Sequence, residues 1–457
     1  MIKFKRLLVT GTSLSLIMLV IAVAAARQRP APVKKVPFVE AARVGDFLAS
    51  IGVNSSISKR GEDLQKTSEA LIYTGISWIR AGYEGDVPTA DFITLHRQTG
   101  VKFSYGLLSG GANIPKLLSG GRKIAEAGGL LAFEGPNEPN NWGIGYKGER
   151  GGRDQTWLPV AKLQRDLYAA VKAAPGLKKY PVWSLSENGA QTDNTGLQFL
   201  EIPEGAKTLL PVGTRLADFA NCHNYIVHPG WPGLHDNQTW IAAAPGFDSK
   251  VDGLSGNYGA TWAKKFEGYT AAQLQTLPRV TTETGLTIGP GVTETRHATL
   301  LLNMYLAQFK RGWSFTAVYL LRDRSDEAGN QQFGFYRPDY TPRAAAIYLH
   351  NMTTILKDKA DPVRRPEPLA YSLQERIPTV HDLLLQKSDG KHYLIVWGEK
   401  LNGSDIVTVL FNGKQRQLKV YDPTIGTQVL QTVRNTATIQ LELSDHPLII
   451  EVGSRNG

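Results

Sequence analysis

The feature that most constrains the fold is a series of short, apolar, strand-like runs that alternate with stretches of helical character. The eight runs are residues 47–53, 78–81, 102–107, 130–134, 181–185, 219–225, 279–282 and 315–321. Successive strand–helix units of this kind build a parallel sheet. Eight such units in one domain predict an α/β fold of the closed (β/α)8 or TIM-barrel type rather than an open sheet.

The segments between the runs carry helical periodicity. Leu163, Leu167 and Val171 recur at i, i+4 and i+8 within a predicted helix over 160–173. Helices are also predicted over 297–310 and 343–357, and the last of these would close the barrel. No G-x-G-x-x-G sequence follows the first run, which argues against a dinucleotide-binding fold. The expected barrel occupies residues 39–360.

The pattern changes after residue 360. Three prolines within 361–368 prevent a further helix. Closely spaced strand-like segments then follow, with turn signals such as Asp389-Gly390 and Asn412-Gly413 between several of them. These segments are 381–387, 393–399, 406–411, 416–421, 427–433, 437–443 and 448–452. They predict a C-terminal antiparallel β-sandwich domain over 361–457.

The N-terminus has the features of an export signal. Lys3, Lys5 and Arg6 precede an uncharged stretch that runs to residue 26 and ends in small residues. We therefore expect a signal peptide over 1–26, a proline-containing linker over 27–38, and a secreted or periplasmic protein. The alternative is an uncleaved membrane anchor, because about 20 apolar residues can span a bilayer. Contact with a membrane is expected only in that case.

Composition excludes several classes of protein. A single cysteine, Cys222, rules out an intramolecular disulfide and any multi-cysteine metal or iron–sulfur site. The net charge is +10, but the basic residues are scattered and do not form the dense stripe of a nucleic-acid-binding surface. We expect no nucleic-acid partner. A mildly basic surface is compatible with anionic surroundings such as an acidic polysaccharide.

Glutamates follow two of the eight predicted strands. Glu138 lies in Asn-Glu-Pro after the fourth run, and Glu283 lies in Thr-Glu-Thr after the seventh. The C-terminal ends of barrel strands carry the working groups, and strands 4 and 7 face each other across the barrel mouth. Two carboxylates on opposite sides of a cleft, one protonated and one ionised, are what cleavage of a glycosidic bond requires. Glu134 and Glu187 also lie near strand ends, and we expect them to support the site or to face solvent.

Two clusters resemble metal sites only superficially. His223, His228, His235 and Asp236 lie close in sequence, but their spacing matches no usual zinc pattern. The acidic segment 323–330 lacks the ligand spacing of an EF-hand. We expect no metal and no cofactor.

The two glutamate motifs resemble those of the clan A glycoside hydrolases, which are retaining (β/α)8 enzymes. A barrel followed by a β-sandwich is similar in architecture to families 39 and 5, and the resemblance spans residues 45–455. It implies an O-glycosyl hydrolase that cleaves β-linked bonds in an oligo- or polysaccharide through a covalent glycosyl-enzyme intermediate. By this resemblance Glu138 is the acid/base and Glu283 the nucleophile. A non-catalytic carbohydrate-binding relative, and a transglycosylase with the same two glutamates, are the alternatives.

Further residues match the same resemblance. It implies that Asn137 hydrogen-bonds the substrate 2-hydroxyl and lies near the Glu283 carboxylate. Arg80, at the end of the second run, matches an arginine that contacts the nucleophile. His223 and Tyr225 are similar to a His-x-Tyr motif whose tyrosine orients or stabilises the nucleophile.

Three aromatic residues are expected near the barrel mouth, namely Trp142, Trp231 and Tyr319. Flat rings stack on sugar faces, and Trp142 is the best candidate platform because it follows Glu138 so closely. The strand-8 tryptophan of family 5 has no counterpart here, since Trp313 precedes the eighth run.

Elementary electrostatics agrees with these roles. A guanidinium beside Glu283 favours its ionised form. Partial burial of Glu138 among Pro136, Pro139 and Trp142 is expected to raise its pKa, as a general acid needs. Carboxyl groups about 5 Å apart give retention and wider spacing gives inversion. A sequence does not supply that distance, so retention is implied here by the resemblance alone.

Overall fold

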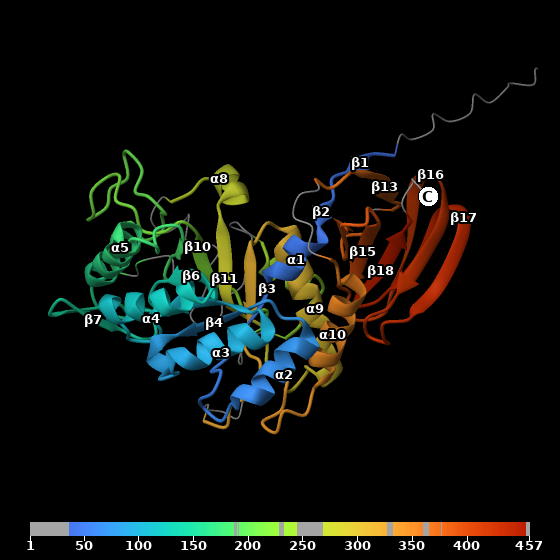
Figure 1. Ribbon diagram of the computed structural model, residues 1–457. Helices are drawn as coiled ribbons and strands as arrows, with labels where there is room; N and C mark the ends of the chain where they lie inside the picture. Colours follow the sequence, from blue (N-terminus) through green and yellow to red (C-terminus); the bar gives the residue numbers. More distant parts are fainter. Residues whose placement is uncertain are drawn as a thin grey trace, which may run out of the picture. The chain divides into compact units, whose positions relative to one another are not determined.

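A computed structural model describes residues 36–186, 190, 192–227, 233–244, 268–326, 332–359, 365–375 and 377–453. Within them, eight parallel strands pair in the order β10-β11-β12-β3-β4-β5-β6-β9 (Figure 1). They are β3 (Ile51–Asn54), β4 (Trp78–Gly82), β5 (Lys102–Gly106), β6 (Leu130–Glu134), β9 (Val182–Trp183), β10 (Ala220–His223), β11 (Arg279–Thr284) and β12 (Phe315–Val318). A parallel bridge between Trp183 and Phe219 joins the last strand to the first. The predicted (β/α)8 barrel is confirmed.

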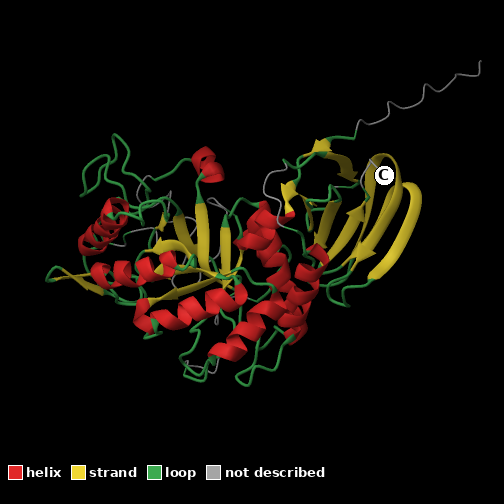
Figure 2. Cartoon of the chain, in the orientation of Figure 1, coloured by secondary structure: helices red, strands yellow, loops and turns green. Residues whose placement is uncertain are grey.

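Helices lie around the barrel strands (Figure 2). They include α2 (Leu64–Thr74), α3 (Thr89–Thr99), α4 (Ile114–Glu126), α5 (Leu158–Ala173), α9 (Glu294–Lys310) and α10 (Ala344–Leu356). Shorter helices are η1 (Tyr83–Gly85), α6 (Gln238–Ala242) and α8 (Ala271–Thr276). Side-chain caps define the N-termini of several of these helices. At the N-terminus of α2, for example, the Asp63 carboxylate accepts from the Lys66 N–H at 2.9 Å. The three helices predicted from periodicity correspond to α5, α9 and α10.

The lower part of the barrel is filled by aromatic rings. Trp78 packs edge-on against Trp183 and Phe315, with ring centroids 5.5 and 5.9 Å away. The indole of Trp78 lies over Gly52 so closely that a Cβ there would be 2.1 Å from the ring. Glycine is therefore required at this point of β3. This packed layer forms a solid floor beneath the polar side chains at the other end of the strands.

The first predicted strand is wrong in its first half. Residues 44–50 form helix α1 (Val44–Ser50), and the strand begins only at Ile51. The buried residues Val44, Phe47 and Ser50 are three apart, which is the spacing of one helical face. Phe47 packs edge-on against Phe309 at 5.3 Å. A short apolar run does not by itself distinguish a strand from a buried helix, and here tertiary packing decides.

The C-terminal region forms a second, curled sheet with the order β1-β13-β16-β18-β15-β14-β2, and β17 pairs with β16 (Figure 1). The strands are β1 (Phe38–Val39), β2 (Ala42–Arg43), β13 (Leu369–Leu373), β14 (Val380–Gln386), β15 (His392–Gly398), β16 (Asp405–Tyr421), β17 (Val429–Leu443) and β18 (Pro447–Val452). The sheet closes around its own apolar core, as the predicted β-sandwich does. β1 pairs with β13 and β2 with β14, so residues before the barrel belong to this sheet.

Two predicted breaks between strands in this region are wrong, because the segments on either side of each break belong to one long strand. Segments 406–411 and 416–421 form the single strand β16, and 427–433 and 437–443 form most of β17. The Asn412-Gly413 pair was expected to be a turn. Instead the pairing register shifts between Leu410 and Gln415, so these residues make a bulge within a continuous ladder.

Strand β15 is buried on both faces. Leu394 and Val396 belong to the core of the second sheet. The alternate residues Tyr393, Ile395 and Trp397 belong to the hydrophobic cluster of the barrel. Because side chains alternate along a strand, one strand can serve two cores, which explains its uninterrupted apolar sequence. Residues from Val36 onward accordingly form one compact unit.

The predicted signal peptide and most of the predicted linker lie outside the described residues. Among the residues that the structure does describe, no helix combines the length and apolar character needed to cross a membrane.

His446 supplies a pH-dependent contribution to stability. Its Nε2 lies 3.3 Å from Asp422 Oδ2 and its Nδ1 lies 3.4 Å from Asp445 Oδ1. Burial lowers the pKa of His446, but the two carboxylates outweigh burial and raise the pKa from 6.5 to about 9. The stabilisation is therefore complete below pH 6.5 and is lost as the pH rises toward 9.

We predict that His446→Gln lowers the free energy of unfolding at pH 6 by up to about 3 kcal/mol. Above about pH 9.5 the difference from the wild type should largely vanish, because the wild-type imidazole is then neutral. Urea unfolding at both pH values measures this. A difference that does not depend on pH would contradict the charge assignment.

Candidate active site

A cavity of about 660 Å³ lies at the C-terminal ends of the barrel strands. Side chains from most of the barrel strands or the loops that follow them reach it, among them Asn54, Arg80, Glu138, Tyr225, Glu283 and Tyr319. Ser55, Ser56, Arg60, Glu62, Arg324 and Asp326 add further polar groups to its lining. The cavity is thus bounded mainly by hydrogen-bonding side chains above the apolar floor.

Glu138 is held by a strained turn directly after β6. Its φ is 40°, in the left-handed region that residues other than glycine rarely adopt. Its N–H donates to Ser186 Oγ at 2.8 Å, and its carbonyl accepts from the N–H groups of Asn141 and Trp142. Three residues earlier, a Cβ on Gly135 would lie 1.9 Å from Gln164 Oε1. The surrounding structure therefore forces the turn that places Glu138 in the cavity.

The Glu138 carboxylate has two polar partners. Oε1 lies 2.7 Å from His223 Nδ1, and Oε2 accepts from Asn141 Nδ2 at 3.1 Å. Burial raises the pKa of Glu138, but the hydrogen bond and charge of His223, together with Asn141, outweigh burial and hold the pKa below its ordinary value. The prediction from the sequence, a raised pKa for Glu138, is wrong. It took account of burial but not of the imidazole that the fold brings to the carboxylate.

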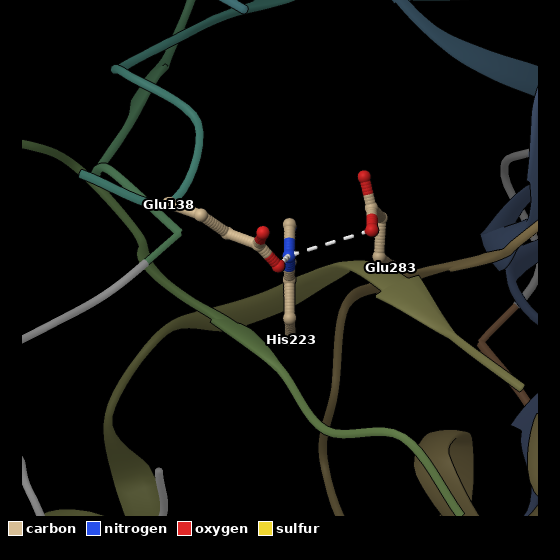
Figure 3. Close-up of side chains that lie close together, drawn as sticks. All are labelled: Glu138, His223 and Glu283. Atoms are coloured by element: carbon tan, nitrogen blue, oxygen red, sulfur yellow. Dashed lines mark hydrogen bonds and ion pairs between the residues drawn. The ribbon is translucent and has the colours of Figure 1, made fainter. Parts of the chain in front are cut away.

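Glu283 lies opposite Glu138, with His223 between them (Figure 3). Oε2 accepts from Tyr225 Oη at 2.7 Å and lies 3.6 Å from His223 Nδ1. Oε1 accepts from Arg80 Nη1. One oxygen of each glutamate and one nitrogen of His223 lie within 4.8 Å of one another. The two carboxylates predicted as a pair therefore do meet in one cavity.

Arg80 is buried and connects Glu283 to a second carboxylate. Its Nε and Nη2 donate to Glu134 Oε1 at 3.0 and 2.8 Å, while Nη2 also donates to Asn137 Oδ1 at 2.7 Å. Burial lowers the pKa of Arg80, but Glu134 and Glu283 outweigh it and raise the pKa above its ordinary value. The permanent charge of this guanidinium therefore lies between two carboxylates of the site.

The other predicted residues fall in three groups. Asn137, which was expected to face the substrate, lines the cavity, where its Oδ1 accepts from Arg80 and its Nδ2 donates to Ser109 Oγ at 3.1 Å. Trp142, with 53% of its surface exposed, and Tyr319 both line the cavity. Trp231 lies outside the described residues, as do Glu187 and His228.

The sequence left the role of Glu134 open between two alternatives and did not single out Asn54 or Thr282 as site residues. Glu134 was expected to support the site or to face solvent, and it is only 1% exposed. Strand alternation gives a signal for it, because Ala132 on the same strand belongs to the interior cluster and Glu134 shares its face. Asn54 and Thr282 are linked by a 2.8 Å hydrogen bond from Asn54 Nδ2 to the Thr282 carbonyl. Strand β12 pairs with both β3 and β11, so the strand order of the sheet brings these two strand ends together.

Glu138, His223 and Glu283 together offer three ligand atoms at distances suited to a metal ion. However, both oxygens of Glu283 already accept hydrogen bonds, one of them from the positively charged Arg80. A cation there would have to displace or adjoin this guanidinium, which is unfavourable. Of the clusters considered from the sequence, His235 contacts its neighbour's carbonyl and Asp323 is paired with Arg343.

The fold resembles solved structures of glycoside hydrolases. A family 39 glycoside hydrolase from Bacteroides cellulosilyticus WH2 has a TM-score of 0.55 and 16% identity over 89% of this chain and 82% of its own. CelM2, a bifunctional glucanase-xylanase from a metagenome library, has a TM-score of 0.55 and 12% identity over 92% of this chain and 98% of its own. A GH51 arabinofuranosidase from Xanthomonas axonopodis pv. citri gives 0.54 and 12% over the same shares.

No protein-family model matches the sequence, and no curated protein is similar to it. The structural likeness nevertheless agrees with the expected architecture, a (β/α)8 barrel followed by a second sheet. At these identities the likeness concerns the fold. The chemistry of this chain depends on the side chains of its own site.

We predict that His223→Phe raises the pKa of Glu138, because it removes the hydrogen bond and the charge that lower it and leaves burial. Asn141→Ala removes a weaker contact and should raise the pKa by less. Titration by ¹³C NMR of protein labelled at glutamate Cδ measures both, with the resonance assigned by its loss in Glu138→Gln. A fall of the pKa in His223→Phe would show that burial is not the opposing cause.

Proposed function

We propose that this protein is a retaining glycoside hydrolase that cleaves β-linked bonds in an oligo- or polysaccharide. The observation that carries the proposal is the approach of Glu138 and Glu283 to within 4.8 Å inside a polar cavity at the barrel mouth. Retaining enzymes hold their two carboxyl groups about 5 Å apart, whereas inverting enzymes leave room for a water molecule between them. The separation in this chain favours retention.

In the first step Glu283 attacks the anomeric carbon. Arg80 and Tyr225 both donate to its carboxylate, and these two contacts hold it in place for the attack. Glu138 passes a proton to the leaving oxygen as the bond breaks, and a covalent glycosyl-enzyme ester forms on Glu283. The Glu138–His223 contact at 2.7 Å holds the proton that this step needs.

In the second step the same residues work in reverse. Once Glu283 is esterified its negative charge is gone, while the Arg80 charge remains and lowers the pKa of Glu138. Glu138 is then ionised and accepts a proton from the attacking water. The water oxygen bonds to the anomeric carbon, the ester bond to Glu283 breaks, and the proton lost in the first step is restored. The anomeric configuration is retained.

The cavity is suited to a sugar. Exposed Trp142 offers a flat apolar face beside Glu138, and Ser55, Ser56 and Asn54 offer hydrogen bonds to hydroxyl groups. The solved structures with a similar fold are named as a glucanase-xylanase and as an arabinofuranosidase, so the fold alone selects no particular sugar. A panel of aryl glycosides and polysaccharides identifies the unit that is accepted.

We also propose that residues 1–26 are a signal peptide and that the mature protein is exported. The support is the basic start, the uncharged stretch and the small residues before residue 27. Mass spectrometry of protein recovered from the expressing cell distinguishes cleavage from an uncleaved anchor.

We predict that Glu283→Ala lowers kcat by about 10⁴-fold or more, because the nucleophile is lost. Azide can occupy the space of the missing carboxylate and attack the β-glycoside directly, which gives an α-glycosyl azide. ¹H NMR of the product shows its configuration. A variant that keeps its full rate would refute the proposal, and the carbohydrate-binding alternative would be favoured if the wild type is equally inactive.

We predict a different pattern for Glu138→Ala. Substrates with poor leaving groups should lose about 10²- to 10⁴-fold in kcat/KM, while activated aryl glycosides still form the glycosyl-enzyme. Azide should attack that intermediate and give a β-glycosyl azide, opposite in configuration to the product of Glu283→Ala. Equal losses on both kinds of substrate and no azide product would contradict the acid/base role. Products longer than the substrate would favour transglycosylation.

A further inference from the structure

The hydroxyl of Thr282 lies between a buried carboxylate and the imidazole that contacts Glu138. Its Oγ1 is 2.9 Å from Glu134 Oε1 and 3.0 Å from His223 Nε2. All three side chains are buried, and they come from strands β11, β6 and β10. Thr282 itself does not line the described cavity, so it can act on the reaction only through the residues that it contacts, among them His223 and Glu134.

The hydrogen-bond pattern fixes the direction of each donor. Glu134 accepts from Arg80, from Ser104 Oγ at 2.8 Å and from Asn221 Nδ2 at 3.2 Å. Surrounded by donors, this carboxylate accepts the Thr282 proton as well. A hydroxyl has one proton, and the charged Glu134 carboxylate at 2.9 Å is a stronger acceptor than the neutral Asn221 Oδ1 at 3.1 Å. The lone pairs of Thr282 then face Asn221 Nδ2, at 2.9 Å, and His223 Nε2.

We propose that Thr282 is a positioning residue that keeps the neutral ring of His223 protonated on Nε2. With that proton fixed, the lone pair of Nδ1 faces Glu138 Oε1, and the mobile proton of the pair lies at this 2.7 Å contact. Glu138 delivers that proton to the leaving oxygen and recovers one from water. If the neutral ring instead carried its proton on Nδ1, His223 would donate to Glu138 and favour its ionised, non-acidic form. This inference rests on the proposed glycosidase function.

Two variants of Thr282 form a matched pair. Thr282→Val keeps the shape and removes the hydroxyl, whereas Thr282→Ser keeps the hydroxyl. We expect Thr282→Val to lower kcat by about 10-fold or more on glycosides with poor leaving groups, with KM and the rate on activated aryl glycosides little changed. Thr282→Ser should behave as the wild type. Uniform losses on both kinds of substrate in Thr282→Val would indicate a merely structural role and overturn the proposal.

The tautomer can be observed without any turnover. In ¹⁵N-histidine-labelled protein, with the His223 signals assigned by their loss in His223→Phe, the neutral ring of the wild type should be protonated on Nε2. In Thr282→Val the proton should move to Nδ1, and in Thr282→Ser it should stay. A wild-type ring protonated on Nδ1 overturns the proposal even if Thr282→Val does not fold. An Nε2-protonated ring in a wild type that hydrolyses no glycoside would instead count against the proposed function alone.

Discussion

The polar end of the barrel depends on one buried guanidinium. Arg80 joins Glu134 and Glu283, and it also holds Asn137. Burying ions costs several kcal/mol each unless their partners and hydrogen bonds are nearly complete, and removing one partner of such a pair costs about 3–5 kcal/mol. The network is therefore an all-or-none feature. It can form only when the strands close into a ring, so the closed barrel and this network of charged groups depend on each other.

The same network separates the environments of the two candidate catalytic carboxylates. Glu283 has a permanent cation and a tyrosine hydroxyl as partners, whereas Glu138 has an imidazole and an amide. Two carboxylates with different partners can take different protonation states in one cavity, which is the requirement for acid/base and nucleophilic roles. His223 is the element common to both, because its Nδ1 approaches an oxygen of each.

The second sheet contacts the part of the barrel that carries His223. Glu399, at the end of β15, is buried and accepts from the N–H groups of Thr239 and Trp240 in α6. That helix follows β10, the strand that carries His223. Together with the two-sided burial of β15, this contact ties the loop that follows His223 to the second sheet. The uninterrupted apolar sequence of β15 reflects its burial between the barrel and the second sheet.

Much of the barrel and of its candidate site could be predicted from the sequence, because hydrophobic periodicity and the ends of strands are local features of the chain. Eight apolar runs and their intervening helical periodicity were enough to predict the barrel, and the positions of Glu138, Glu283 and Arg80 at strand ends were enough to predict that they share its mouth. Where a local pattern was ambiguous the prediction failed. The helix over 44–50 reads as part of a strand, and the Asn412-Gly413 bulge reads as a turn.

What only the tertiary structure decided is how the polar groups satisfy one another. Periodicity reports which face of an element is buried, but the partner of a buried charge comes from a distant strand. The pKa of Glu138 is lowered by an imidazole that lies 85 positions further along the chain, so burial alone gave the wrong direction. Likewise the links of buried Glu134 to Arg80 and Thr282 exist only where three strand ends converge. The sequence determined the barrel and its two glutamates; the closed ring determined their electrostatics.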